Sequence, residues 1–147
     1  FACDSIMSTP VPYLFKIHLQ RLEKKMPAIN VTEAQFEELI LKEGTVLVDF
    51  WAAWCGPCRS FAPVYEAASD KYPEMTFAKV DTEAEQSLAA AAGITSIPTL
   101  MIFRDGILLF SQPGALPASG LDDLISQVSA LNMDEIRKEI AADKTSQ

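Results

Sequence analysis

Histidine and cysteine are scarce in this sequence, which has one histidine and three cysteines among 147 residues. The histidine, His18, stands far from the two cysteines that lie close together, so a hydrolase that needs a Cys–His pair has no candidate base in the body of the chain. Three cysteines also cannot build the multiple disulfide framework of a small secreted domain. We therefore expect a reducing compartment, the cytoplasm.

Long apolar runs and an excess of positive charge are also lacking. No apolar stretch reaches the roughly 18–20 residues that a membrane span requires. The chain carries 20 acidic and 12 basic side chains, a net charge of −8, and residues 27–147 hold 18 of the acidic and 8 of the basic ones. This balance disfavours binding to nucleic acid. The apolar fraction of 49% with 22% charged residues is typical of one globular domain, which we expect to be a monomer.

Two of the cysteines belong to the motif Trp54-Cys55-Gly56-Pro57-Cys58, which follows an apolar run typical of a strand and precedes a segment typical of a helix. Thiols three positions apart on the first helical turn share one face and can form a disulfide. Unpaired N–H groups at a helix start stabilise a thiolate, so we expect Cys55, the more exposed thiol, to have a pKa lowered toward neutral and to be the nucleophile. Pro57 fits the first turn and fixes the sulfur separation, and Gly56 allows a substrate backbone to approach.

Half of a zinc site is the alternative interpretation of two cysteines at this spacing. Such a site needs two more ligands, and the chain offers only Cys3 and His18, both in a remote N-terminal segment. The Gly-Pro pair between the cysteines and the flanking tryptophan favour redox chemistry. We expect neither a metal nor a bound cofactor.

The rest of the chain alternates between strand and helix patterns from Pro27 onward. The dipeptide Asp105-Gly106 predicts a tight hairpin between the last two strands, which would be antiparallel. The segment 45–53 is apolar except at Asp49, as in a central strand that is covered on both faces. The expected strands are 28–31, 45–53, 76–81, 99–104 and 107–111, and the expected helices are 33–43, 55–72, 83–92 and 118–131.

The run from Val48 to Arg59, with its Trp-Cys-Gly-Pro-Cys core, resembles the active-site signature of the thioredoxin family. The order βαβ, then α, then ββα resembles the fold of the same family over about Ala28–Leu131. The resemblance implies an α/β thioredoxin fold, a central mixed β-sheet flanked by helices on both faces.

The resemblance also implies which residues meet the substrate. Ser96-Ile97-Pro98 is similar to the family's cis-proline loop, which faces the disulfide and offers backbone groups to an extended peptide. Gly114 matches a glycine in a second loop at the substrate groove. Together with Trp54, which should be partly exposed beside the sulfurs, these residues are the predicted substrate-binding set.

Asp49 and Lys79 match the family's buried acid and a lysine near it. Apolar neighbours predict that Asp49 is buried, and burial predicts a raised pKa. A carboxylate poised near neutrality can accept the proton that Cys58 loses during turnover. A purely structural acid, satisfied by backbone donors, is the alternative.

The function that the resemblance implies is reduction of protein disulfides by dithiol–disulfide exchange through Cys55 and Cys58, as a general electron donor for cytoplasmic disulfides. The implied partners are protein disulfide substrates and a flavin-containing, NADPH-dependent thioredoxin reductase. Two alternatives remain: a disulfide oxidase or isomerase, and a non-enzymatic peptide-binding module that acts as a holdase.

The two ends lie outside the matched region. Phe15, Leu19, Leu22 and Met26 recur at helical spacing, so residues 1–26 are expected to be one amphipathic helix or a tag-like extension. A translation-start or expression extension, a targeting segment and a docking helix are the three interpretations. Residues 132–147 begin with a capping-box pattern, which predicts one more helix and a polar tail.

Overall fold

The computed structural model describes residues 28–145. The helix predicted within residues 1–26, and with it Cys3 and His18, lies outside the described residues. In the described part of the chain, no helix is both long and apolar enough to cross a membrane.

One five-stranded sheet forms the centre of the molecule, in the order β1-β3-β2-β4-β5. β1 and β2 run parallel to β3, whereas β4 is antiparallel to β2 and to β5. The predicted hairpin at Asp105-Gly106 is confirmed, and both residues have positive φ, 53° and 82°. The strands are β1 Ile29–Asn30, β2 Thr45–Trp51, β3 Thr76–Asp81, β4 Thr99–Arg104 and β5 Ile107–Pro113.

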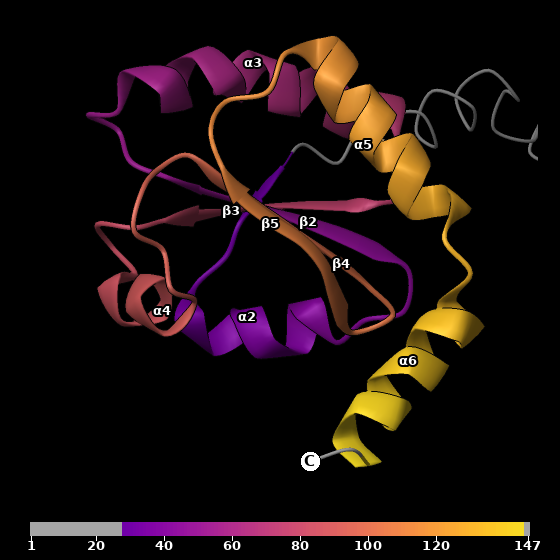
Figure 1. Ribbon diagram of the computed structural model, residues 1–147. Coiled ribbons are helices and arrows are strands. Elements are labelled where there is room, and N and C mark those ends of the chain that lie inside the picture. Colours follow the sequence, from indigo (N-terminus) through magenta and orange to yellow (C-terminus); the bar gives the residue numbers. More distant parts are fainter. Residues whose placement is uncertain (1–27, 146–147) are drawn as a thin grey trace, which may run out of the picture.

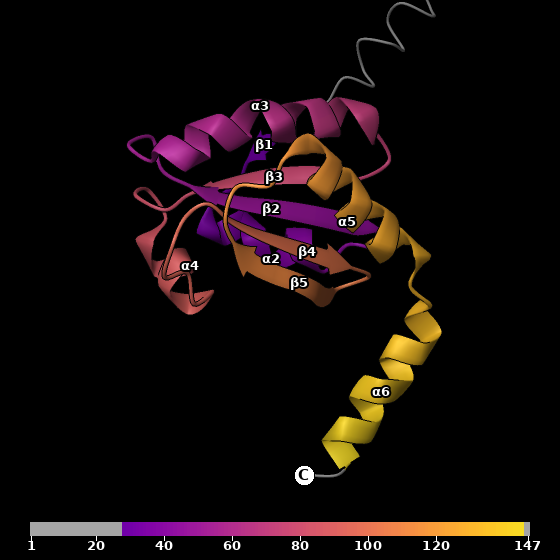
Figure 2. The ribbon, with the colours of Figure 1, turned by 45° about the horizontal axis from the view of Figure 1, so that its top comes forward.

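Helices cover both faces of the sheet (Figure 1), with α3 and α5 on one face and α2 and α4 on the other. The predicted fold class, a mixed sheet between two helical layers, is therefore confirmed. A further helix, α6, follows α5 and extends away from the sheet (Figure 2), as the capping pattern at Asn132 predicts. The helices are α2 Glu33–Ile40, α3 Gly56–Lys71, α4 Gln86–Ala91, α5 Ala118–Ala130 and α6 Met133–Thr145.

Element ends differ from the prediction where side chains build turns. α4 was expected from Glu83 but begins at Gln86, because the Asp81 carboxylate accepts hydrogen bonds from the backbone N–H groups of Glu83 and Ala84, at 2.9 and 3.4 Å. Such an aspartate turn competes with the first turn of a helix. β2 ends at Trp51 instead of Ala53, since the chain turns there into the redox motif.

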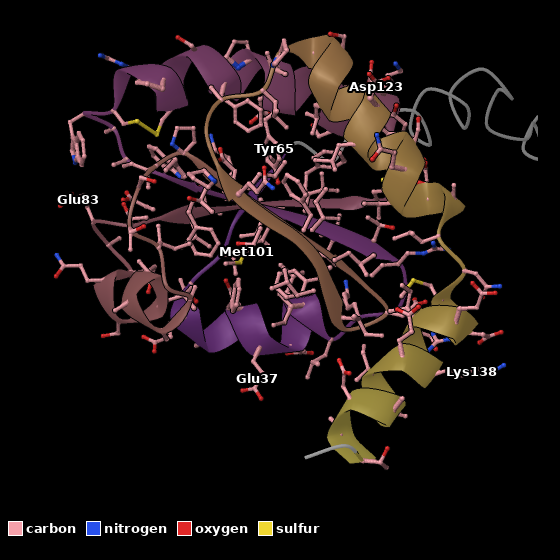
Figure 3. All side chains as sticks on the ribbon, in the orientation of Figure 1. Glu37, Tyr65, Glu83, Met101, Asp123 and Lys138 are labelled. Atoms are coloured by element: carbon pink, nitrogen blue, oxygen red, sulfur yellow. A yellow bond between two sulfur atoms is a disulfide. The ribbon has the colours of Figure 1, made fainter. Side chains whose placement is uncertain are left out.

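Two apolar clusters, one on each face, hold the layers together. The cluster beneath α3 and α5 includes Tyr65, whose hydroxyl lies 2.9 Å from the carbonyl oxygen of Leu47 and 2.7 Å from that of Ala78 (Figure 3). A hydroxyl has one proton and so donates to one of these oxygens at a time. Because Leu47 is in β2 and Ala78 in β3, Tyr65 anchors the helix that carries Cys58 on the two central strands.

The start of α6 is attached to the hairpin. The guanidinium of Arg137 lies 3.1 Å from the Asp105 carboxylate, and Met133 is buried. Arg104 donates to the carbonyl oxygens of Val128 and Leu131, at 2.9 and 3.0 Å, and so satisfies the end of α5.

Candidate active site

Cys55 and Cys58 meet at the N-terminus of α3, where the sequence places them. Cys55 is the N-cap residue, with extended backbone, and the backbone N–H of Cys58 donates to Cys55 Sγ at 3.2 Å. The two Sγ atoms form a disulfide, with a Cα–Cα distance of 5.2 Å. Pro57 occupies the first turn, where its missing N–H leaves no bond unmade. The structure is therefore the oxidised form of a dithiol whose first sulfur accepts a helix N–H.

Both cysteines are almost completely buried in this disulfide form. Cys55, the thiol expected to be the more exposed, is 4% exposed and Cys58 is 3% exposed, so the difference between them is small. Trp51 and Ile97 pack against the small cluster that the cysteines form with Ala52, so both sulfurs are covered. Ile97 belongs to the loop that the family resemblance places opposite the disulfide, 42 positions after Cys55.

A groove of about 500 Å³ runs past the disulfide. Trp54 is 67% exposed, and a Cβ placed on Gly56 would meet no atom within 4 Å, so the rim beside the sulfurs is open. The lining is mostly apolar and comes from three segments: Trp54, Cys55, Gly56 and Pro57 from the motif, Thr82 and Ala89 from the β3–α4 region, and Ile94, Thr95, Ser96 and Ile97 from the loop before β4.

The loop before β4 lies against the disulfide as expected. The Ile97–Pro98 peptide bond is cis, and the Ile97 carbonyl oxygen lies 3.7 Å from Cys55 Sγ. Gly114, with a φ of +114°, donates its N–H to the Pro98 carbonyl oxygen at 2.8 Å. A side chain at that φ would be strained, so glycine suits this position. The two loops that the sequence pairs with the motif thus lie next to each other.

Asp49 is in the middle of β2, 1% exposed, and its register partner on β3 is Lys79. Burial away from water raises the pKa of Asp49 from 3.8 to about 7, while the positive charge of Lys79 acts in the opposite direction. The raised pKa predicted from the apolar neighbours is therefore confirmed. The Lys79 ammonium also lies 4.9 Å from the centre of the Trp51 ring, a cation–π contact.

A small cavity of about 90 Å³ joins the acid to the second cysteine. Two polar atoms at this place, Asp49 Oδ1 and Trp51 Nε1, are buried without a hydrogen-bond partner among the described residues. A cavity of this size can admit water between the acid and the second cysteine. Its walls are Asp49, Trp51, Ala52, Cys58, Arg59, Ala62 and Lys79.

Sequence reasoning missed several residues of this region. Thr82, Ala89, Ile94 and Thr95 line the groove, and the Glu83 carboxylate accepts a hydrogen bond from the Trp54 indole N–H at 2.8 Å. Their residue types are ordinary for a loop and a helix end, so only the fold marks them.

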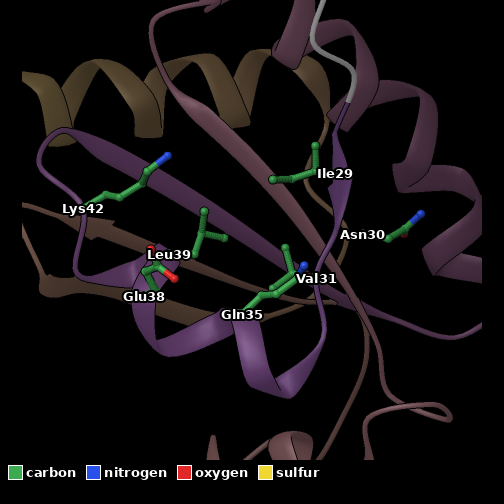
Figure 4. A pocket seen from close by; sticks show the side chains of 7 residues that line it. All are labelled: Ile29, Asn30, Val31, Gln35, Glu38, Leu39 and Lys42. Carbon is green, nitrogen blue, oxygen red and sulfur yellow. The ribbon is translucent and has the colours of Figure 1, made fainter.

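A second hollow, of about 360 Å³, lies between β1 and α2 (Figure 4). Its lining has no cysteine and shares no residue with the groove at the disulfide, so it does not belong to the redox site. The lining residues are Ile29, Asn30, Val31, Gln35, Glu38, Leu39 and Lys42.

A dithiol capping a helix, facing a cis-proline loop on a mixed sheet, defines the site of a thiol–disulfide oxidoreductase. The family model for Thioredoxin matches residues 27–127. The chain belongs to the thioredoxin family.

Individual relatives agree with this assignment. A protein assigned as thioredoxin 2 in Streptomyces coelicolor is 51% identical, over 77% of this chain and 84% of its own length. The thioredoxin of Pseudomonas aeruginosa is 44% identical, over 63% of this chain and 88% of its own length. Among solved structures, the thioredoxin of Malassezia sympodialis gives a TM-score of 0.64 at 33% identity, covering 71% of this chain and 96% of its own. A mutant thioredoxin from Halobacterium salinarum gives a TM-score of 0.66 at 31% identity, covering 74% of this chain and 96% of its own.

Proposed function

We propose that this thiol–disulfide oxidoreductase works as a reductase of protein disulfides, with Cys55 as the nucleophile and Cys58 as the resolving thiol. The observation that carries these roles is the hydrogen bond from the Cys58 N–H to Cys55 Sγ at the start of α3. A sulfur at this place gains a donor and the positive end of the helix dipole, and both favour its thiolate. Cys58, one turn further into the helix, lines the small cavity that Asp49 also lines.

The reaction proceeds in two exchanges. The Cys55 thiolate attacks one sulfur of the substrate disulfide, a mixed disulfide forms, and the other substrate sulfur leaves as a thiolate. Cys58, after losing its proton, attacks Cys55 Sγ and releases the second substrate sulfur. The substrate gains two electrons and two protons, and the Cys55–Cys58 disulfide of this structure is the product on the enzyme.

Asp49 is the proposed acceptor of the Cys58 proton. Its pKa, raised to about 7 by burial, lies close to neutral pH, so the carboxylate can both accept and release a proton there. The 90 Å³ cavity supports transfer through water, because both Asp49 and Cys58 line it. Lys79 has the proposed role of favouring the charged form of Asp49.

The groove is the proposed site for an extended stretch of the substrate. Trp54 and Ile97 supply apolar surface in the groove, and Ser96 supplies backbone groups beside the cis bond. Gly114 holds the Pro98 loop through its N–H, which donates to the Pro98 carbonyl oxygen. No charged side chain lines the groove, so substrates that present apolar residues beside their disulfide suit it.

Re-reduction by an NADPH-dependent thioredoxin reductase in the cytoplasm completes the proposal. Reduction of insulin disulfides, coupled to NADPH oxidation through such a reductase, is the direct test. Thioredoxin itself is the reference for the class, with a potential of about −270 mV, whereas isomerases and oxidases of this type lie between about −180 and −120 mV. A measured potential in the latter range, with no insulin turnover, would assign the chain to the oxidases or isomerases instead.

We further propose that residues 27–131 are the catalytic unit. Deleting residues 1–26 is then expected to leave insulin reduction within about twofold of the full chain, because residues of the described part of the chain build both apolar clusters. Steady-state kinetics and thermal unfolding of the two proteins make the comparison. A large fall in melting temperature would contradict this division and favour the docking-helix interpretation of the segment.

A further inference from the structure

Tyr65 lies on the buried side of α3, in line with the resolving cysteine. Cys58, Phe61 and Tyr65 follow one another at spacings of three and four residues, so their side chains share one face of the helix. All three are buried, and Figure 3 shows Tyr65 between α3 and the sheet. This buried stripe is the surface by which α3 presents Cys58 to the strands beneath it.

The hydroxyl of Tyr65 joins the stripe to both central strands, close to the proposed proton acceptor. It lies 2.9 Å from the Leu47 carbonyl oxygen in β2 and 2.7 Å from that of Ala78 in β3. Leu47 comes two positions before Asp49, so their side chains point to the same face of β2. Ala78 directly precedes Lys79. The hydroxyl therefore ties α3 to the backbone beside Asp49 and Lys79.

The backbone of α3 is interrupted just before Tyr65, because Pro63 lies inside the helix. Proline has no N–H, so the Arg59 carbonyl receives no helix bond from position 63. Packing has to hold the first turns in place instead. The Phe61 ring lies 5.7 Å from that of Tyr65, which lies 5.2 Å from that of Phe77 in β3. Through Phe61, Tyr65 thus supports the redox turn across the interruption.

We propose that Tyr65 is a positioning residue for the second exchange, which fixes the placement of Cys58 relative to Asp49 across the small cavity that both residues line. The inference rests on the proposed function, in which Cys58 loses its proton to Asp49. A general base must lie within hydrogen-bond reach of that proton, or one water away, so a small displacement of α3 slows resolution.

Tyr65 does not itself take up the proton. Its burial, and in addition the charge of Asp49, raise the pKa of the Tyr65 hydroxyl well above its usual range. The hydroxyl therefore stays protonated at every pH at which the thiols react. Its part in the second exchange is to hold the helix and the strands at a fixed spacing.

The first test is Tyr65→Phe in the full chain, which removes the hydroxyl and keeps the ring. Stopped-flow measurement is expected to show resolution of the mixed disulfide slowed about threefold to tenfold, with the first exchange within about twofold of the parent rate. A loosened cavity admits more water, which lowers the pKa of Asp49, so the pH midpoint of resolution is expected to move to lower pH.

Tyr72→Phe is the matched control. Tyr72 is the C-cap of the same helix, and its hydroxyl lies 3.1 Å from the Asp122 carboxylate of α5. Its loss removes a hydroxyl that joins α3 to a neighbouring helix and not to the strands. Both exchange rates and the pH midpoint are expected to stay at their parent values in this variant.

A second measurement compares the effect of Tyr65→Phe in the parent chain with its effect in Asp49→Ala. If the hydroxyl acts through the placement of Cys58 against Asp49, its removal is expected to slow resolution less than about twofold once Asp49 is absent. Equal slowing in the two backgrounds, equal slowing of both exchanges, or unchanged resolution in Tyr65→Phe would each overturn the proposal. None of these outcomes touches the reductase function, which fails only if the parent chain does not reduce insulin.

Discussion

Replacing Cys55 by serine is expected to abolish insulin reduction, whereas replacing Cys58 by serine is expected to stop the reaction at a stable mixed disulfide between Cys55 and the substrate. The reason lies in the N-terminus of α3, where Cys55 Sγ receives the Cys58 N–H and Cys58 does not receive an equivalent donor from Cys55. Cys55 is therefore the sulfur that is stabilised as a thiolate, and only Cys58 is placed to release the substrate from it.

Mass spectrometry of the trapped complex, after proteolysis without reductant, identifies the sulfur that holds the substrate. Cys3→Ser is the matched control, because it removes a cysteine outside the motif and is expected to leave both turnover and trapping unchanged. Trapping through Cys58 in a Cys55→Ser protein would reverse the proposed roles. The double variant Cys55→Ser, Cys58→Ser has no redox thiols at the active site. If it still protects another protein from aggregation, the holdase alternative is favoured.

Replacing Asp49 by asparagine or alanine is expected to slow the second exchange while stabilising the protein near neutral pH. The kinetic effect follows from the loss of the proton acceptor next to Cys58, and general acid–base contributions of this kind are typically about 10²–10⁴-fold. Stopped-flow measurement of mixed-disulfide resolution between pH 6 and pH 8 makes the test. Unchanged resolution over this range would make Asp49 a structural acid, whose proton exchange takes no part in turnover.

The stability effect has a defined sign. The pKa of Asp49 is about 7 in the folded protein and 3.8 as its ordinary value, so the folded state binds more protons between these two values. The free energy of unfolding that depends on this group is thus fully present below about pH 4, falls as the pH rises toward 7, and stays low above it. Because the pKa rises from 3.8 to about 7, the free energy of unfolding that depends on Asp49 falls by about 4 kcal/mol across this pH range.

Chemical denaturation of the parent protein and Asp49→Asn at pH 4, 5.5 and 7 measures this dependence. The advantage of the variant is expected to grow with pH over this window. Asp123→Asn serves as the control, because Asp123 is an exposed carboxylate on α5 and its loss removes an equal charge without removing a buried group (Figure 3). An advantage of Asp49→Asn that shrinks as the pH rises would contradict the assignment of the raised pKa.

Much of the fold follows from local patterns in the sequence. β3 and β4 have the bounds expected from the sequence, 76–81 and 99–104. Asp105-Gly106 gives the hairpin because both residues adopt positive φ, as a tight two-residue turn requires. The cysteine spacing and Pro57 determine the geometry of the redox turn, since only two residues separate the cysteines and the φ of one of them is fixed by proline. Asp49 stands alone among apolar neighbours, so its burial and its raised pKa were predictable as well.

Other features depend on contacts between distant segments, which a local pattern does not contain. The nearly equal burial of Cys55 and Cys58 results from the cover that Ile97 provides, and the late start of α4 results from the Asp81 turn. The bond from Trp54 to Glu83 needs β2 and β3 to be neighbours in the sheet, so that their carboxyl ends lie together. The sequence by itself therefore determined the strands, the hairpin and the chemistry of the dithiol, because these rest on neighbouring residues. Only the tertiary structure decided how the sulfurs are covered, which turn holds Trp54 and where the cavity between Asp49 and Cys58 lies, because each of these brings together residues that the chain keeps apart.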